Sequence, residues 1–215
     1  MDTLNSLSYG NPNKEVLDLI LKDSFLDSVF LELKNEPIPS NDSELTKDEL
    51  NEIVDSIAAV SDEENQEYLK RFKAYDKSLL QTIVSIFKEE NIDVEEYCTE
   101  ISKDLKPLIS KLKYHFQRPR PYQLAYAYKL KLFPYKSSTD DSPSLPSGHT
   151  LQAFVILNVI GNKHPQVYKF CKEIIEDISN SRVYLGLHYP SDNDFAKLVG
   201  SKILKNPDFT KKYGI

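Results

Sequence analysis

Helical periodicity is the feature that most constrains this chain. Apolar residues recur every three or four positions in almost every segment, and no stretch of useful length alternates apolar and polar residues as a strand does. This spacing predicts helices over residues 13–35, 46–60, 61–87, 93–112, 149–161, 165–186 and 192–205. Irregular structure is expected over residues 36–45 and 119–146, where turn-forming residues gather. The sequence therefore predicts an all-α bundle.

Two residue pairs have the spacing of capping boxes. In Thr46 with Glu49, and in Ser61 with Glu64, a hydroxyl and a carboxylate could bond the free N–H groups of a first helical turn. We therefore expect helices to begin at Thr46 and at Ser61. Pro107 lies inside a later helical segment and is expected to kink it.

The chain is long enough to bury a sizeable core but too polar to cross a membrane. Its 215 residues are 40% hydrophobic and 28% charged, which is typical of one globular domain or at most two small ones. No apolar run approaches the roughly 20 residues that a membrane helix needs. Residues 1–25 lack the basic and apolar regions of a secretory signal. A soluble, cytoplasmic protein without a membrane span is expected, or a periplasmic or secreted one if a leader precedes this sequence.

The two cysteines, Cys98 and Cys171, each stand at an apolar position of a helical segment. A single pair of cysteines is far fewer than a disulfide framework uses. We therefore predict two buried free thiols.

The formal charge of −6 conceals two halves of opposite sign. Residues 1–110 carry 11 lysines and arginines against 25 aspartates and glutamates, which gives −14, whereas residues 111–215 carry 16 against 8, which gives +8. The overall charge argues against nucleic acid as a partner. A site for a small anion is expected in the second half, because its positive charge would attract such a ligand.

The lysine–arginine motif, KYHFQRPRP from Lys113 to Pro121, ends a helical segment. Lys113 and Arg120 are seven residues apart, about two helical turns, so both side chains can lie on one face. The Arg-Pro-Arg-Pro sequence ends the helix and places the last guanidinium on an extended segment. Lys111 and Arg118 have the same spacing, and a solvated basic helix end would explain either pair.

The PSGH motif, Pro146 to His149, stands just before the apolar segment LQAFVILNVIG. A turn through Ser147 and Gly148 at a helix start would point free backbone N–H groups at a bound anion. His149 is placed to exchange a proton with that anion or its leaving group. A simpler interpretation makes Ser147 an N-cap and Gly148 a turn residue, but it leaves His149 without a role.

The arginine–histidine–aspartate motif runs from Arg182 through His188 to Asp192. A histidine and an aspartate four residues apart can be a capping pair, a metal-ligand pair or a histidine oriented by a carboxylate. Arg182 favours an anion site over a metal site, because Lys113, Arg120 and Arg182 would together repel a metal ion.

The three motifs together resemble the signature of the type 2 phosphatidic acid phosphatase (PAP2) superfamily, which includes bacterial non-specific acid phosphatases and vanadium haloperoxidases. That signature reads K-x6-R-P, P-S-G-H and S-R-x5-H-x3-D. Every position of it is filled in this sequence, by Lys113, Arg120, Pro121, Pro146, Ser147, Gly148, His149, Ser181, Arg182, His188 and Asp192.

Within the superfamily the sequence is most similar to the soluble class A acid phosphatases. The segment KYHFQRPRPY resembles their K-x-H-Y-M-R-x-R-P-F, which assigns Lys113 and Arg120 to the motif. The likeness covers about residues 110–210, and residues 1–100 hold no family motif. The stretch before Pro146 reads Pro-Ser-Leu where class A enzymes usually have Gly-Ser-Tyr, and their secretion signal is missing.

The resemblance implies a single-domain helical bundle over residues 1–215, with an active site between core helices. An acidic helical half, residues 1–105, would precede a PAP2-like catalytic core, residues 106–215. The implied activity is that of a metal-independent phosphomonoesterase, similar to acid phosphatases, which acts on small soluble phosphate esters through a phosphohistidine. Phosphate transfer to other acceptors and inhibition by vanadate are implied too. No cofactor and no metal are implied, the partner is the substrate ester, and a homo-oligomer is compatible with the sequence.

The resemblance also assigns roles to single residues. His188 would be the nucleophile, Asp192 would orient it, and His149 would act as acid and base. The phosphate-binding residues would be Lys113, Arg120, Ser147, Gly148 and Arg182. Two histidines in different protonation states imply a bell-shaped rate profile on the acid side of neutral. The alternatives are a vanadate-dependent haloperoxidase, whose chains are usually much longer, and a non-catalytic phosphate-binding or interaction module, which would not need both histidines.

Overall fold

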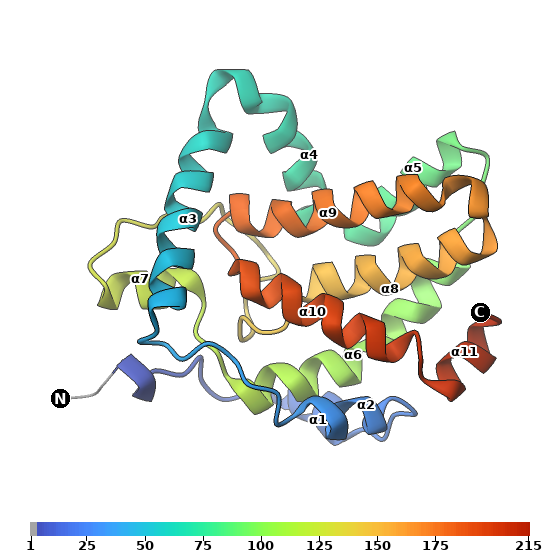
Figure 1. The fold of residues 1–215 in the computed structure, drawn as a ribbon, viewed down its shortest axis with the longest axis horizontal. Helices are drawn as coiled ribbons and strands as arrows, with labels where there is room; N and C mark the ends of the chain where they lie inside the picture. Colours follow the sequence, from blue (N-terminus) through green and yellow to red (C-terminus); the bar gives the residue numbers. More distant parts are fainter. Residues whose placement is uncertain (1–3) are drawn as a thin grey trace.

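The computed structural model describes residues 4–215. They fold into helices joined by turns and loops, with no β-strand in the described range (Figure 1). The all-α class that the apolar spacing predicts is therefore confirmed. The α-helices are α1 (Lys14–Leu21), α2 (Asp27–Leu33), α3 (Glu44–Ser61), α4 (Gln66–Lys77), α5 (Leu79–Glu89), α6 (Glu95–Phe116), α7 (Pro121–Ala127), α8 (Gly148–Lys163), α9 (Tyr168–Tyr184), α10 (Pro190–Ile203) and α11 (Pro207–Tyr213). Three short 3-10 helices are η1 (Leu4–Ser6), η2 (Glu63–Asn65) and η3 (Pro165–Val167).

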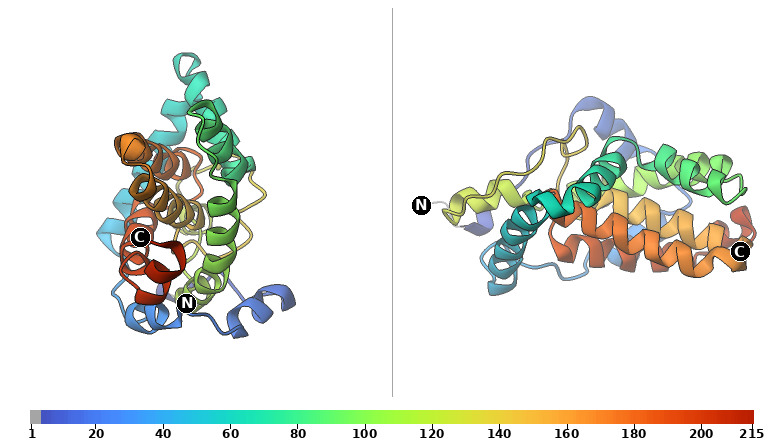
Figure 2. Two further views of the ribbon diagram at one scale, coloured as in Figure 1. Left: turned by 90° about the vertical axis from the view of Figure 1, so that its right-hand side faces the viewer. Right: turned by 90° about the horizontal axis from the view of Figure 1, so that it is seen from above.

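Helix α8 lies at the centre of the bundle. Its sequence is apolar almost without interruption from Leu151 to Gly161, and residues on every face of it are buried. A helix that is apolar all round needs neighbours on all sides. α6, α9 and α10 supply them by packing against α8, and α8, α9 and α10 run side by side along the long axis of the molecule (Figures 1 and 2).

The core helices bring four of their ends together at one end of the bundle. α6 and α9 end there, and α8 and α10 begin there (Figure 1). The backbone N of Ser147, just before α8, donates to the carbonyl of Asp192 in the first turn of α10 at 3.2 Å. Two helix starts side by side point free N–H groups and positive dipole ends at the same region.

The acidic first half shares its core with the second half. Leu26, Phe72 and Ile83 lie in the same buried apolar cluster as Ile156 and Ile178. A smaller cluster joins α3 to α7, the loop that follows α7 and the end of α9; its buried members are Leu50, Ile53, Leu124, Ala125, Leu132, Val183 and Tyr189. α3 and α4 both pack on α9 and rise together from the rest of the bundle (Figures 1 and 2).

Residues 13–35 form two helices, so the single helix predicted there is wrong. α1 ends at Leu21 and α2 begins at Asp27. In the turn between them, Oδ2 of Asp27 accepts from the backbone N of Ser24 at 3.1 Å, and Oγ of Ser24 accepts from the backbone N of Leu26 at 3.2 Å. Side chains that bond the nearby backbone in this way offer it an alternative to the helix.

The helix starts predicted from the two capping boxes are also wrong. α3 begins after Ser43, whose hydroxyl accepts from the backbone N of Thr46 at 3.1 Å, so Thr46 and Glu49 lie inside the helix. Ser61 is the last residue of α3, and its hydroxyl donates to the carbonyl of Ile57 at 2.6 Å.

Two further boundaries differ from the prediction. The segment 61–87 is divided between α4 and α5 at Ser78. The segment 119–146, predicted to be irregular, contains α7, which starts at Pro121. Proline suits a first helical position because it has no N–H to leave unpaired there.

Cys98 and Cys171 are both buried and free, as predicted. None of the helices in the described range is both long enough and apolar enough to span a bilayer.

Gly200 lies where α10 packs closely on α8, so a larger residue at this position tests that contact. A Cβ atom at this position would overlap the ring of Phe154. We expect Gly200→Ala to lower the free energy of unfolding by about 1–2 kcal/mol, because overpacking outweighs the higher helix propensity of alanine. Urea denaturation measures the change, with Ser201→Ala in the same helix as the control. A Gly200→Ala variant as stable as that control would contradict the tight contact.

Candidate active site

The three motifs meet where α6 and α9 end and α8 and α10 begin. Lys113 lies near the end of α6, and Arg120 follows just before α7. The PSGH motif leads into the first turn of α8, Arg182 lies near the end of α9, and His188 precedes α10. The structure therefore gathers the residues that the sequence predicted for the site at one end of the bundle.

His188 is held at both ring nitrogens. Its Nδ1 lies 3.0 Å from Oδ2 of Asp192, and its Nε2 lies 3.0 Å from Nη1 of Arg120. A guanidinium can only donate, so Nε2 must accept and the ring proton must be on Nδ1, which donates to Asp192. Burial and Arg120 lower the pKa of His188 well below its usual range, although Asp192 opposes them. His188 is therefore neutral, with the lone pair of Nε2 directed at Arg120.

Asp192 is a fully buried carboxylate with both oxygens engaged. Oδ1 accepts from Nη1 of Arg118 at 2.7 Å. Oδ2 accepts from His188, from the backbone N of Tyr189 at 3.1 Å and from the hydroxyl of Ser144. Burial raises the pKa of Asp192, but Arg118, His188 and Ser144 together hold it below its usual range. Asp192 thus stays charged and fixes the plane of the His188 ring.

Two of the three cations donate to main-chain carbonyls. Nζ of Lys113 donates to the carbonyl of Pro143. Nε of Arg120 donates to the carbonyl of Ser142 at 2.7 Å, and its Nη1 donates to that of Leu187 at 2.8 Å. Burial and the neighbouring Arg120 hold the pKa of Lys113 well below its usual range. Because these acceptors are neutral oxygens, neither side chain is paired with a carboxylate through these bonds, and a bound anion would raise the pKa of Lys113 again.

The third cation, Arg182, is paired with a carboxylate of the acidic half. Its Nη1 donates to Oδ1 of Asp76 in α4 at 2.9 Å, and the same oxygen accepts from the hydroxyls of Ser137 at 2.7 Å and Thr139 at 3.0 Å. Burial lowers the pKa of Arg182 to about 10, although Asp76 opposes this. Nε of Arg182 is buried and has no hydrogen-bond partner among the described residues. It is a donor that a bound oxygen could satisfy.

The hydroxyl and the backbone N–H of Ser147 are hydrogen-bonded to other residues of the protein. Its hydroxyl donates to Oγ1 of Thr150 at 3.0 Å and accepts from the backbone N of Thr150 at 3.5 Å, while its own backbone N donates to Asp192. Ser147 is thus the N-cap of α8, and its contact with phosphate stays a prediction. Gly148 and His149 follow in the first turn, whose N–H groups lack partners within a helix. Burial, Arg182 and His188 lower the pKa of His149.

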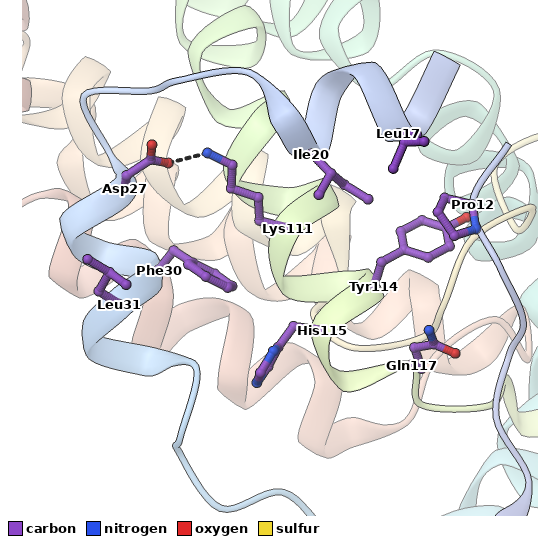
Figure 3. A pocket seen from close by; sticks show the side chains of 10 residues that line it. All are labelled: Pro12, Leu17, Ile20, Asp27, Phe30, Leu31, Lys111, Tyr114, His115 and Gln117. Carbon is purple, nitrogen blue, oxygen red and sulfur yellow. Dashed lines mark hydrogen bonds and ion pairs between the residues drawn. The ribbon is translucent and has the colours of Figure 1, made fainter. Parts of the chain in front are cut away.

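The structure separates the two registers of the lysine–arginine motif. Lys111 lies away from the site and pairs with Asp27 of α2 beside a groove of about 570 Å³ between α1, α2 and α6 (Figure 3). His115 lines the same groove, and its Nε2 lies 2.6 Å from the carbonyl of Lys34. Lys113, two residues after Lys111, is therefore the lysine that reaches the site.

The sequence analysis assigned no role in the site to four residues of this cluster: Glu49, Asp76, Arg118 and Ser144. Arg118 entered only through the alternative register, and Ser144 only as part of the departure from the class A pattern. Glu49 entered only as part of a predicted capping box, and Asp76 lies among the many carboxylates of the acidic half. Asp76 follows Phe72 by four residues, so it lies on the apolar face of α4, and this position is the one signal that could have found it.

Comparison with known proteins supports the superfamily. Residues 101–203, which contain all three motifs, match the family model described as PAP2 superfamily, in agreement with the superfamily that the motifs predict. No curated protein matches the chain. A similar solved structure is that of the first transmembrane PAP2 type phosphatidylglycerolphosphate phosphatase from Bacillus subtilis. It is 18% identical, has a TM-score of 0.56, and the match covers 93% of this chain and 98% of that chain.

The structural match extends the likeness beyond the three motifs. Because it covers 93% of this chain, it includes most of the acidic half, in which no family motif was found. The similar structure is a transmembrane phosphatase, whereas the sequence resembled soluble class A acid phosphatases. The comparisons therefore support the superfamily and its fold, and the class A subclass stays a prediction.

The pairing of Asp76 with Arg182 predicts a large loss of stability when the carboxylate is removed. In Asp76→Ala the buried Arg182 would keep its charge and lose its partner. We expect the free energy of unfolding to fall by about 3 kcal/mol. Urea denaturation measures this loss, and Asp48→Ala, at an exposed position of α3, should change it by less than about 0.5 kcal/mol. Equal stability of the two variants would contradict the importance of the pair.

Proposed function

We propose that this protein is a metal-independent phosphomonoesterase that hydrolyses small phosphate esters through a phosphohistidine. The observation that carries the proposal is the geometry of His188, whose Nε2 lone pair faces Arg120 while Asp192 holds the proton of Nδ1. A phosphate bound to Arg120 would place its phosphorus beside a nucleophile that is already deprotonated and oriented. The match of residues 101–203 to the PAP2 superfamily supports the same chemistry.

Phosphate would bind by replacing neutral acceptors of the cations. The phosphate oxygens would replace the carbonyls of Pro143 and Ser142 as the acceptors of Lys113 and Arg120. A phosphate oxygen would also accept from Nε of Arg182. Hydrogen bonds between charged partners are roughly twice as strong as those to neutral groups. They also tighten as negative charge gathers on the oxygens in the transition state.

The reaction would proceed in two displacements. In the first, Nε2 of His188 bonds to phosphorus, the bond from phosphorus to the ester oxygen breaks, and His149 donates a proton to that oxygen. In the second, His149 takes a proton from water as the water oxygen bonds to phosphorus. The bond from His188 to phosphorus then breaks, which releases inorganic phosphate and returns both histidines to their starting states.

His149 must carry a proton for the first displacement. Burial and the nearby Arg182 lower its pKa, so it is neutral when no anion is bound. A bound phosphate dianion would offset the positive charge around His149 and raise its pKa again. The proton is therefore taken up together with the substrate, which favours turnover on the acid side of neutral.

The phosphate-binding residues do not select the alcohol of the ester, because they would contact only the phosphoryl group. The resemblance to class A enzymes favours small soluble esters, whereas the similar solved structure is named for a lipid phosphate. Rates measured on an aryl phosphate and on phosphatidylglycerophosphate in detergent micelles distinguish these two classes of substrate.

The proposed nucleophile provides the direct test. The purified protein is expected to hydrolyse an aryl phosphate in the presence of EDTA and to form an acid-labile phosphoenzyme. His188→Ala should lower kcat by at least about 10³-fold and abolish the phosphoenzyme, because the proposed bond to phosphorus forms at Nε2 of His188. Rapid acid quench with a ³²P-labelled substrate measures both. A phosphoenzyme in the His188→Ala variant would overturn the assignment.

The proposed phosphate ligands are tested by vanadate, which resembles phosphate in charge and shape. Lys113→Ala should weaken vanadate inhibition by about 10- to 100-fold, the value of one lost charged hydrogen bond. Lys111→Ala is the matched control, since Lys111 pairs with Asp27 away from the site. A weaker inhibition in Lys111→Ala than in Lys113→Ala would reverse the register.

A further inference from the structure

Glu49 is a buried carboxylate in the middle of α3, in the acidic half of the chain. Only 4% of its surface is exposed, and it lies inside the helix rather than at its start. Burial raises its pKa, and Arg118 opposes this. A buried carboxylate is costly unless it is paired and hydrogen-bonded. Its partners must therefore explain why it is there.

Those partners all belong to the start of α10 and the end of the lysine–arginine motif. Oε1 of Glu49 accepts from the backbone N of Ser191 at 2.6 Å, and Oε2 accepts from the hydroxyl of Ser191 at 2.9 Å. Oε2 also accepts from Nη2 of Arg118 at 3.1 Å. Glu49 is thus hydrogen-bonded both to the first turn of α10 and to one side of the Arg118 guanidinium.

Arg118 links Glu49 to Asp192 by bonding both carboxylates. Its Nη1 donates to Oδ1 of Asp192 and to the hydroxyl of Ser191, both at 2.7 Å. Its guanidinium carbon lies 3.9 Å from the centre of the Tyr189 ring. A planar guanidinium that is bonded at two edges and stacked on an aromatic face has little freedom to turn.

The position of the Asp192 carboxylate follows from this arrangement. Arg118 holds Oδ1, so Oδ2 is left facing Nδ1 of His188 at 3.0 Å. If Arg118 turned or moved, Oδ1 of Asp192 would lose its bond to Arg118, the carboxylate could rotate about the bonds that hold Oδ2, and the His188 ring would be less firmly oriented. Lys113, Arg120 and Arg182 have no direct bond to Glu49.

We infer that Glu49 is a positioning residue for the proposed reaction: acting through Arg118 and Ser191, it aligns Asp192 and thereby the nucleophile His188. This inference rests on the proposed function, and it gives the acidic half a role in the chemistry. Glu49 lies outside residues 101–203, the segment that the family model matches. It touches neither the phosphate nor its ligands, so its effect should appear in kcat and not in KM.

The test replaces Glu49 by its near-isosteric amide. Glu49→Gln is expected to lower kcat on an aryl phosphate about 10- to 100-fold, the range that a small misplacement of a reacting group causes, with KM and vanadate inhibition unchanged. Glu52→Gln is the matched control and should keep the wild-type kcat, because Glu52 lies about one helical turn after Glu49 in α3 and is exposed. Ser191→Ala removes one contact each of Glu49 and Arg118 and should lower kcat in the same direction by less.

A second measurement does not depend on turnover. In the ¹⁵N NMR spectrum of histidine-labelled protein, His188 should show a proton on Nδ1 and an unprotonated Nε2 in the wild type. In Glu49→Gln the less firmly oriented ring should part from Arg120 for some of the time, which releases Nε2 and gives a mixture of both tautomers. If the wild type hydrolyses no ester, the proposed function fails while this readout still tests Glu49. An unchanged tautomer would overturn the inference, as would a kcat in Glu49→Gln equal to that of Glu52→Gln. A rise in KM with kcat unchanged would overturn it too, since it would assign Glu49 to substrate binding.

Discussion

The buried carboxylate of Asp192 is the interaction on which the rest of the site depends. Arg118, Ser144, His188 and the backbone of Tyr189 all donate to it. Those donors come from the segment after α6, the loop before α8 and the turn before α10, so one carboxylate joins three separate parts of the chain. Inside a protein such bonds are stronger than in water, and each is costly to leave unmade. Asp192 therefore sets both the geometry of the site and the relative positions of the helices around it.

The structure explains part of the opposite charge of the two halves, because carboxylates of the acidic half pair with arginines at the site. Three cations, Lys113, Arg120 and Arg182, are buried near one another in the basic half and would repel if nothing balanced them. Asp76 and Glu49 come from the acidic half and neutralise arginines at the site, while most other carboxylates of that half are exposed. The two halves thus fold as complements, because neither contains a balanced set of buried charges.

The fold class and the motif residues could be predicted from the sequence because both signals are local. Apolar spacing reports helices over a few turns, and each motif spans at most a dozen residues. The break after Leu21 could not be predicted, since it depends on how Ser24 and Asp27 bond the backbone. The roles of Glu49 and Asp76 could not be predicted either, because their arginine partners are 69 and 106 residues away. Only the folded chain shows which carboxylates of an acidic segment are buried.

The loop carbonyls that hold Lys113 and Arg120 bear on which anions the site would prefer. The oxygens of Pro143 and Ser142 already occupy these donors, so an incoming anion competes with peptide groups of the protein itself. Binding then exchanges one hydrogen-bond acceptor for another. The free energy of binding becomes more favourable as the negative charge of the anion increases, because the carbonyl that it replaces is neutral. A doubly charged monoester would displace the loop more readily than a singly charged diester. Discrimination between the two would thus arise from competition at the cations, without any steric barrier.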